Sequence, residues 1–199
     1  TPTNSLNIKN HHLKTLQDGN VTLQATLGNQ HSNILHVNVF WEVNGYRLPP
    51  EPDPKINNAT LLGIDVNNNG VRDDVERWIY ETYNHPIERG LFMQSARAYQ
   101  IVIVDPSKAH ETVKYSDATL SCIFYWRYDA LDNNESFLLD KNKDRIAIKE
   151  LKKIQFNSIA RHIAYQKYNA EFHGKVLSSP SSSKDNCEFD NDGILKKLP

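Results

Sequence analysis

Residues 65–76 carry oxygen-bearing side chains at a regular spacing that could hold a metal ion. The run reads Asp65-Val66-Asn67-Asn68-Asn69-Gly70-Val71-Arg72-Asp73-Asp74-Val75-Glu76. In a tightly turning loop, side chains at alternate positions converge on one point, and Ca²⁺ takes about six to eight oxygen ligands. Gly70 permits the sharp turn. The spacing therefore predicts a calcium site whose ligands are Asp65, Asn67, Asn69, the backbone carbonyl of Val71, Asp73 and Glu76.

This spacing resembles the loop of EF-hand calcium-binding proteins at every specified position. The resemblance implies that Asp73 binds the ion directly or through a water molecule and that Glu76 supplies both carboxylate oxygens. Two features depart from the family pattern: Arg72 stands where paired loops carry an aliphatic residue, and the proline-rich residues 49–54 leave no room for a regular preceding helix. We therefore expect a lone EF-hand-like loop with a structural ion and, because two ligands are asparagines, an affinity of roughly 10⁻⁴ to 10⁻³ M.

Two other interpretations of the loop stay open. One is a polar Asn-Gly turn without a metal, in which Asp73, Asp74 and Glu76 only complement the dipole of the following helix. The other is a Mg²⁺ site, which is less favoured because Mg²⁺ demands tight octahedral geometry and usually keeps several waters. Agreement over the whole pattern favours calcium.

A longer stretch, residues 49–100 together with residues 187–190, resembles a group of uncharacterised bacterial exported or lipoprotein-like proteins. In that group a similar proline-rich lead precedes a calcium-like loop and a helical bundle. The matching run here extends from Leu62-Gly63-Ile64-Asp65 to Glu76-Arg77-Trp78-Ile79-Tyr80. The resemblance implies an exported protein and brings no established activity with it.

The two cysteines of the chain are Cys122 and Cys187. Residues 178–184 before Cys187 are rich in Ser and Pro and cannot anchor themselves by burial. A disulfide to Cys122 would tie this tail down and would require an oxidising compartment, whereas the alternative is two free thiols. The missing initiator Met also fits a removed signal segment, although a trimmed chain would begin in the same way. We expect a periplasmic or secreted protein, with or without a lipid anchor on a removed N-terminal segment.

Periodicity predicts strands first and helices afterwards. Residues 21–27 and 34–43 alternate apolar and polar types around a turn, and Asn44-Gly45 follows as a second turn signal, so we expect a hairpin or small sheet.

Helical periodicity begins at Arg72, with Val75 and Ile79 on one face and Arg77 facing away. Caps and apolar spacing predict helices over residues 72–84, 86–104, 106–128 and 145–173. Pro86 suits the first position of the second helix, and Asp105 can cap the third. The last helix is interrupted before Asn157, which can cap the segment 158–172.

These elements predict an α+β protein with a short N-terminal β segment, a proline-rich crossing, a single calcium loop and a mainly helical bundle. The expected division has three parts. They are the β segment at residues 1–48, the calcium loop and bundle at residues 49–177, and a Ser/Pro-rich tail at residues 178–199 that is tied by a disulfide.

The composition narrows the classes of protein to which the chain can belong. Lys and Arg number 23 and Asp and Glu 24, so the formal net charge of −1 creates no field that favours nucleic acid. No apolar stretch reaches the roughly 18 residues that span a bilayer. The Gly-x-Ser-x-Gly nucleophile motif and His-Cys zinc spacing do not occur in the sequence. We therefore expect no nucleic-acid partner, no transmembrane segment and no catalytic residues.

The expected function is an exported, calcium-binding, non-enzymatic module whose partner is another protein or the cell envelope. A bacterial immunity or inhibitor protein is the specific case that we favour. The alternative is an exported hydrolase with a structural calcium site and an active-site cleft. A concave pocket with two or more titratable side chains would favour the hydrolase, and an exposed apolar or acidic patch would favour the binding protein.

Overall fold

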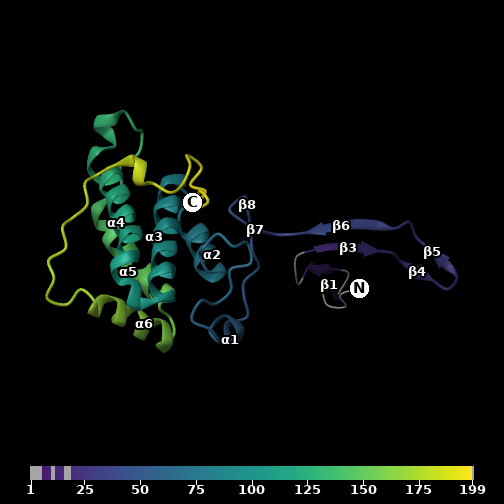
Figure 1. Cartoon of the computed structure of the whole chain (residues 1–199). Coiled ribbons are helices and arrows are strands. Elements are labelled where there is room, and N and C mark those ends of the chain that lie inside the picture. The colour runs from purple at the N-terminus through teal and green to yellow at the C-terminus, as the bar shows by residue number, and fades with distance from the viewer. Residues whose placement is uncertain (1–5, 10–11, 16–18, 199) are drawn as a thin grey trace. The chain divides into compact units, whose positions relative to one another are not determined.

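The computed structural model describes residues 6–9, 12–15 and 19–198 of the chain. The chain divides into two units, residues 1–50 and residues 51–199. The first unit contains strands β1 to β8 and the second contains helices α1 to α6 (Figure 1), which confirms the predicted α+β class. Parts of the predicted N-terminal β segment lie outside the described residues, namely residues 1–5, 10–11 and 16–18.

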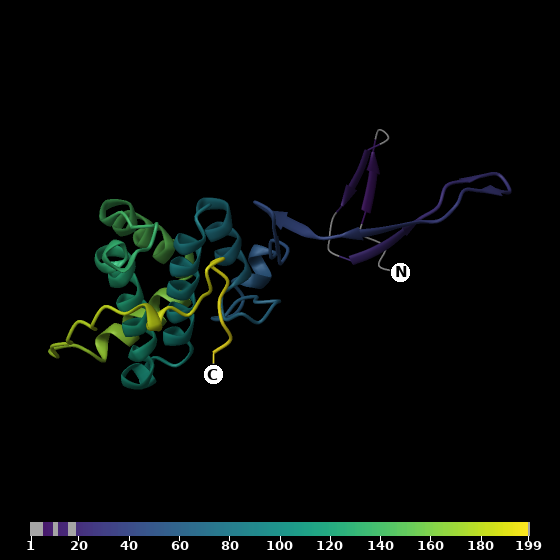
Figure 2. The ribbon, with the colours of Figure 1, turned by 90° about the horizontal axis from the view of Figure 1, so that it is seen from above.

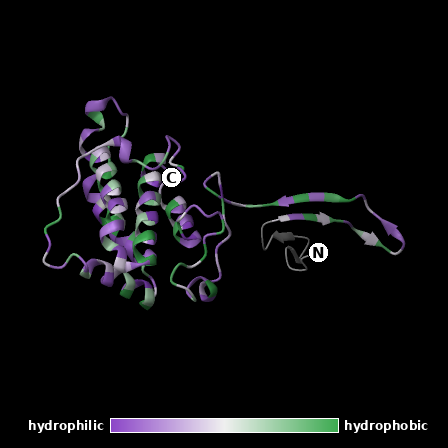
Figure 3. Cartoon of the chain, in the orientation of Figure 1, coloured by the Kyte–Doolittle hydropathy of each residue, from purple (hydrophilic) through white to green (hydrophobic). Residues whose placement is uncertain are grey.

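The N-terminal unit is built from antiparallel ribbons. Within the described residues, β1 pairs with β2, β3 with β6, β4 with β5 and β7 with β8. These strands are Leu6–Lys9 (β1), His12–Thr15 (β2), Gly19–Leu23 (β3), Thr26–Leu27 (β4), Gln30–His31 (β5), Leu35–Val39 (β6), Trp41–Val43 (β7) and Tyr46–Leu48 (β8). Val21 lies opposite Val37 and Leu23 opposite Leu35, so apolar side chains share one face of the β3–β6 ribbon. Figure 3 shows the alternation along β6.

The turn between β7 and β8 follows from its two central residues. Asn44 has a φ of 50° and Gly45 a φ of 84°. Two consecutive positive φ angles define the tight hairpin turn whose twist matches that of the flanking strands, and an Asn-Gly pair adopts it at little cost. The predicted hairpin is therefore present at this position.

The C-terminal unit is mainly helical. Its α-helices are Pro54–Asn57 (α1), Asp73–Thr82 (α2), Pro86–Val104 (α3), Ala109–Phe124 (α4), Lys141–Gln155 (α5) and Ile159–Ala170 (α6). Shorter helical turns are Pro106–Lys108 (η1), the π-helical Tyr125–Asp129 (η2), Leu131–Asn133 (η3) and Lys184–Asn186 (η4). Helix α3 packs against α4, α5 and α6 (Figures 1 and 2). Among the described residues, no helix has the length and apolarity needed to cross a membrane.

Capping explains most of the helix limits. Helix α3 begins at Pro86 as predicted, because proline suits the first helical position and the His85 side chain accepts the Ile87 N–H. Helix α5 begins at Lys141, four residues earlier than predicted, because the Asp140 carboxylate accepts the N–H groups of Asn142 and Lys143 at 2.8 and 3.2 Å. The polar connection before α5 is correspondingly shorter than the sequence suggested.

The cap of α6 differs by one residue from the prediction. Ser158 caps the helix, since its hydroxyl accepts the Arg161 N–H at 3.3 Å. Asn157, which we predicted as the cap, instead accepts a hydrogen bond from the Arg161 guanidinium at 2.6 Å. Cap rules consider only backbone donors, so they cannot predict a side-chain partner of this kind.

The predicted disulfide is present between Cys122 on α4 and Cys187, with the two Cα atoms 5.0 Å apart. Both cysteines belong to a buried apolar cluster. The tail, defined here as residues 178–198, crosses the helices in Figure 2. It has further anchors: Phe189 is 5% exposed, and its ring occupies the space where a Cβ on Gly90 of α3 would lie, 2.4 Å away. The tail is therefore held by packing as well as by the covalent bond.

Four buried guanidinium groups organise the segments that lack regular structure. Arg72, Arg89, Arg97 and Arg161 are each at most 2% exposed. Arg97 donates to the Lys196 carbonyl at 2.8 Å and pairs with Glu188 of the tail at 2.6 Å. Arg161 contacts the lead segment, defined here as residues 51–64. It donates to the carbonyls of Asn57 and Leu61 at 2.5 and 2.9 Å. Arg97 and Arg161 thus supply donors to backbone carbonyls that have no partner in a helix or sheet.

Candidate metal centre

Loop 65–76 turns sharply around its first carboxylate. Asn68 has a φ of 54° and Gly70 a φ of 84°, so both lie in the left-handed region. The two oxygens of Asp65 accept the N–H groups of Asn69 at 3.2 Å and Gly70 at 2.9 Å. The backbone therefore wraps around Asp65, as a loop that gathers ligands about one point must.

Glu76, at the last loop position, faces the asparagines at the start of the loop. Its side chain is 4% exposed. Asn67 Nδ2 donates to Oε2 at 3.0 Å, and Asn69 Nδ2 donates to Oε1 at 2.9 Å. Both carboxylate oxygens thus lie against the amides that the sequence pattern assigns as fellow ligands. Rotation of each amide about its terminal bond would present oxygen in place of nitrogen.

Asp73 closes the loop at its base. Its side chain is fully buried and accepts the Val66 N–H at 3.1 and 3.3 Å. Its own N–H donates to the Ile64 carbonyl at 2.8 Å. These bonds join the residues on either side of Asp65 to the first turn of α2, so the lead segment and the helix cannot separate without breaking the loop.

The electrostatics of the loop favour a cation. Burial, aided by the neighbouring carboxylates, raises the pKa of Asp73 to about 6 and that of Glu76 to about 7. Hydrogen bonds from Val66 and from the two asparagines oppose part of these pKa shifts. Among the described residues, Asp65, Asp73 and Glu76 form no ion pair with a basic side chain. Their negative charge is therefore balanced only by amide dipoles.

Arg72 shows how a lone loop is anchored without a sister loop. The guanidinium pairs with Asp74 at 2.5 and 3.1 Å and donates to the carbonyls of Gln155 at 3.0 Å and Ile154 at 2.8 Å. These carbonyls lie at the C-terminal end of α5, where backbone oxygens have no helical donor. The residue that departs from the paired-loop pattern thus docks the loop on a helix.

Gly63 is needed for this docking. It has a φ of 71°, and a Cβ at this position would lie 2.3 Å from Arg72 Cδ and 2.8 Å from Arg161 Nη2. The lead segment therefore passes between two buried arginines at a point where only hydrogen fits. Burial and the nearby Arg72 charge lower the pKa of Arg161 to about 10, so Arg161 stays protonated at neutral pH. Sequence reasoning missed this pair, because its partners are far apart along the chain.

The structure brings the predicted ligands into one loop without making a cluster of carboxylates. Asp65, Asn67, Asn69 and Glu76 are linked by the hydrogen bonds described above, whereas Asp73 bonds to Val66 and Ile64. The Val71 carbonyl accepts no backbone hydrogen bond within the described residues. Among all the residues that the structure describes, no group of three or more His, Cys, Asp or Glu side chains is placed to hold a metal ion. A metal at this loop would therefore depend on amide and backbone oxygens as well as carboxylates.

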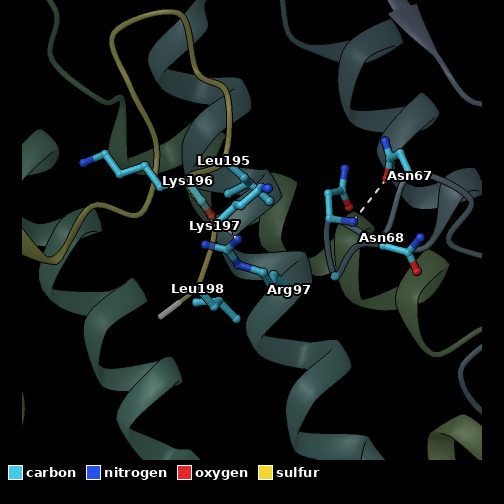
Figure 4. A pocket seen from close by; sticks show the side chains of 9 residues that line it. Asn67, Asn68, Arg97, Leu195, Lys196, Lys197 and Leu198 are labelled. Carbon is cyan, nitrogen blue, oxygen red and sulfur yellow. Dashed lines mark hydrogen bonds between the residues drawn. The ribbon is translucent and has the colours of Figure 1, made fainter.

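A pocket of about 490 Å³ opens beside the loop. Figure 4 shows Asn67 and Asn68 on one side of it and Arg97 with residues of the tail on the other. Its lining comprises Asn67, Asn68, Asn69, Gly70, Arg97, Leu195, Lys196, Lys197 and Leu198. The asparagines of the loop are thus reachable from solvent, whereas Asp73 and Glu76 beneath them are buried.

Comparisons of the chain with protein-family models, with curated proteins and with solved structures find no match. An assignment of function therefore rests on the chemistry of this chain's own residues. The predicted likeness to exported bacterial proteins stays a prediction.

Proposed function

We propose that the protein binds one Ca²⁺ ion in loop 65–76 and uses it to hold the lead segment against α2. The ligands are the carboxylates of Asp65, Asp73 and Glu76, the side-chain oxygens of Asn67 and Asn69, and the Val71 carbonyl. The observation that carries this proposal is the buried Glu76 carboxylate, whose two oxygens lie against Asn67 and Asn69. When bound, the ion supplies the positive charge that these carboxylates lack.

The role of this site is structural, since the loop is docked on α5 through Arg72 and has no sister loop to open against. The lead segment begins at Glu51, which pairs with Arg77 of α2 at 2.8 Å. It ends at Ile64, whose carbonyl accepts the Asp73 N–H. Holding the loop closed therefore fixes the C-terminal end of the lead segment on α2, the helix to which the Glu51–Arg77 ion pair joins its other end.

Titration calorimetry tests the site directly. We expect saturable Ca²⁺ binding with a dissociation constant of roughly 10⁻⁴ M and weaker binding of Mg²⁺. Glu76→Gln should abolish most of the binding heat because it removes a charged oxygen ligand. Glu81→Gln on the exposed side of α2 is the matched control and should bind as the wild type does. Absence of binding heat up to about 10 mM Ca²⁺ would leave the loop as an Asn-Gly turn and refute the proposal.

Helix α2, held in this way, forms part of the surface that we propose binds another protein. An apolar groove of about 330 Å³ lies between α2, α3 and α5. Trp78 of α2, Phe92 of α3 and Ile146 of α5 line it, and Ile146 is 61% exposed. Glu88 and Glu150 outnumber Lys143 at its rim. The favoured occupant is therefore a partner protein that inserts an apolar side chain flanked by basic residues.

Peptide selection tests the groove through the chemistry of the sequences that bind it. Phage-displayed peptides selected on the wild type in calcium should combine an aromatic or aliphatic residue with Lys or Arg. They should lose binding to Ile146→Glu and keep binding to Ile163→Glu, which alters a residue of α6 that is 48% exposed. Selected peptides that bind both variants equally, or that lack basic residues, would argue against this surface.

The hydrolase alternative would need titratable groups that are free to act. A pocket of about 390 Å³ beside the tail contains Lys184, Asp185 and Asp190. Lys184 pairs with Glu135, and Asp190 accepts the N–H groups of Asp192 and Ile194. Because Lys184 and Asp190 hold the tail in place, this pocket favours an architectural role over a catalytic one, and we propose the binding class.

The disulfide supports an oxidising location such as the periplasm or the exterior of the cell. An immunity or inhibitor protein within the family of exported proteins that the sequence resembles is the specific case that we propose. Its target would be a secreted protein with the groove-filling chemistry described above. Intact-mass analysis of protein recovered from the periplasm or medium, with and without reductant, checks the compartment and the bond together.

A further inference from the structure

A further cavity lies between the helices of the bundle, and its lining shares no residue with the calcium loop or the apolar groove. It measures about 340 Å³ and is lined by residues of α3, α4, α5 and α6 together with two residues that follow α6. Its apolar wall consists of Ala98, Val113, Leu120, Ile123, Ile148, Phe172 and Leu177. This volume falls within the range of small-molecule sites, which lie commonly between the helices of bundles.

The cavity also holds two charges of opposite sign that have no ion-pair partner. Asp117 of α4 and Lys152 of α5 are both half-buried in its wall. Among the described residues, neither side chain forms a hydrogen bond or a salt bridge. The Lys152 ammonium lies over the rings of Tyr99 and Tyr165, 5.5 and 5.4 Å from their centroids. Aromatic faces position this cation but leave its hydrogen-bond donors unused.

The polar groups gather around the aromatic part of the cavity. Tyr168 of α6 lines the cavity together with Asp117, and burial raises the pKa of its hydroxyl. Asn169, one residue further along α6, also lines the cavity, and its side chain forms no hydrogen bond within the described residues. A carboxylate, an ammonium and an amide therefore surround an apolar volume without engaging one another.

The charge pattern decides which ligand fits. A purely anionic ligand would meet Lys152 favourably and Asp117 unfavourably, and a purely cationic ligand would do the reverse. A ligand that carries both charges satisfies both groups, and an apolar body fills the remaining wall. We propose that this cavity binds a zwitterionic small molecule with a large apolar side chain, of the class of aromatic or branched aliphatic amino acids, with its ammonium group on Asp117 and its carboxylate on Lys152.

Ligand titration of the wild-type protein gives the first test, using calorimetry or ligand-observed magnetic resonance. The probes are L-phenylalanine, 3-phenylpropionate, which lacks the ammonium group, and 2-phenylethylamine, which lacks the carboxylate. We expect saturable binding of phenylalanine and about tenfold or greater loss of affinity for each analogue. Equal binding of either analogue would overturn the zwitterionic assignment. No saturable binding of phenylalanine, leucine or tyrosine up to about 10 mM would overturn the site.

Variants give a second test that is independent of the analogues. Asp117→Asn should weaken phenylalanine binding by about tenfold or more while leaving 3-phenylpropionate binding unchanged or stronger, and Lys152→Met should show the mirror pattern with 2-phenylethylamine. Glu111→Gln on α4 and Lys149→Met on α5 alter residues outside the cavity and serve as matched controls. Uniform weakening of all three probes, in variants whose melting temperature equals that of the wild type, would contradict the assigned roles of the two charges.

Discussion

The lead segment and the tail solve the same physical problem with different crosslinks. Both run largely without regular structure against the helices, so both depend on buried arginines to satisfy backbone carbonyls. The tail is also held by the Cys122–Cys187 disulfide, which is covalent and independent of pH and ions. The lead segment ends in a loop of carboxylates without a basic partner among the described residues. The comparison shows that the tail is held covalently, whereas under the proposed calcium binding the lead segment is held in a way that depends on pH and on the ion.

Removal of the disulfide should have the largest effect on stability. The bond closes a loop across a sequence separation of 65 residues, for which chain entropy predicts about 4 kcal/mol of stabilisation. We expect Cys122→Ser combined with Cys187→Ser to lower the free energy of unfolding by about that amount in denaturant titrations. Hydrogen exchange should increase in the tail more than in the lead segment. Equal loss of protection in both segments would show that they are not independently fastened.

Removal of the Arg161 guanidinium should have the next largest effect on stability, and it should mainly destabilise the lead segment. Arg161→Met would leave the carbonyls of Asn57 and Leu61 without these donors and uncover part of the lead segment. We expect a loss of about 3 kcal/mol, because buried acceptors that lose a charged donor keep their desolvation cost. Arg145→Met, at an exposed position on α5, is the control. A loss of less than about 0.5 kcal/mol would mean that Arg161 is not an anchor.

The pH dependence should separate the conditional fastening from the permanent one. In calcium-free solution, Asp73 and Glu76 have pKa values of about 6 and 7, above their ordinary values. The folded protein therefore binds more protons than the unfolded chain, so their contribution to stability is present at low pH and is lost as pH rises through about 4 to 7. Between pH 5 and 8 we expect a fall on the order of 2 kcal/mol, after allowance for solvent screening.

Two comparisons isolate this effect from that of other carboxylates. Glu76→Gln should flatten the pH profile between pH 5 and 8, whereas Glu81→Gln should leave it unchanged. Saturating Ca²⁺ should reverse the slope for the wild type, because the ionised carboxylates then have a cation to bind. An identical slope for the wild type and Glu76→Gln in chelator would mean that the loop carboxylates do not titrate in this range.

Calcium itself should produce the smallest shift in stability and the most local one. With a dissociation constant of roughly 10⁻⁴ M, about 1 mM free Ca²⁺ adds about 1.4 kcal/mol by mass action, or about 3 to 6 °C in melting temperature. Hydrogen exchange should slow in the loop and the lead segment and stay unchanged in the tail. If chelator leaves the melting curve unchanged, calcium does not stabilise the lead segment.

Local features of the sequence were sufficient for much of the fold. Alternation and the Asn44-Gly45 pair predicted the hairpins, and Pro86 and Asp105 marked the start and end of α3. The loop pattern assigned Glu76, Asn67 and Asn69 as fellow calcium ligands; the structure places them in hydrogen-bonding contact, and their binding of calcium stays a prediction. These features depend on residues close together in the chain, so composition and spacing are enough to read them.

Contacts between distant residues were decided only by the tertiary structure. We predicted that Arg77 would face away from the core, but it is 9% exposed and pairs with Glu51. Nothing near Arg72 in the sequence indicates that its partners are the last carbonyls of α5, or that Gly63 must pass between Arg72 and Arg161. A guanidinium on a long flexible stem can reach many acceptors, and only the packed helices determine which of them lack a donor. The sequence by itself therefore determines the loop pattern, whereas only the fold determines which arginines hold the loop in place.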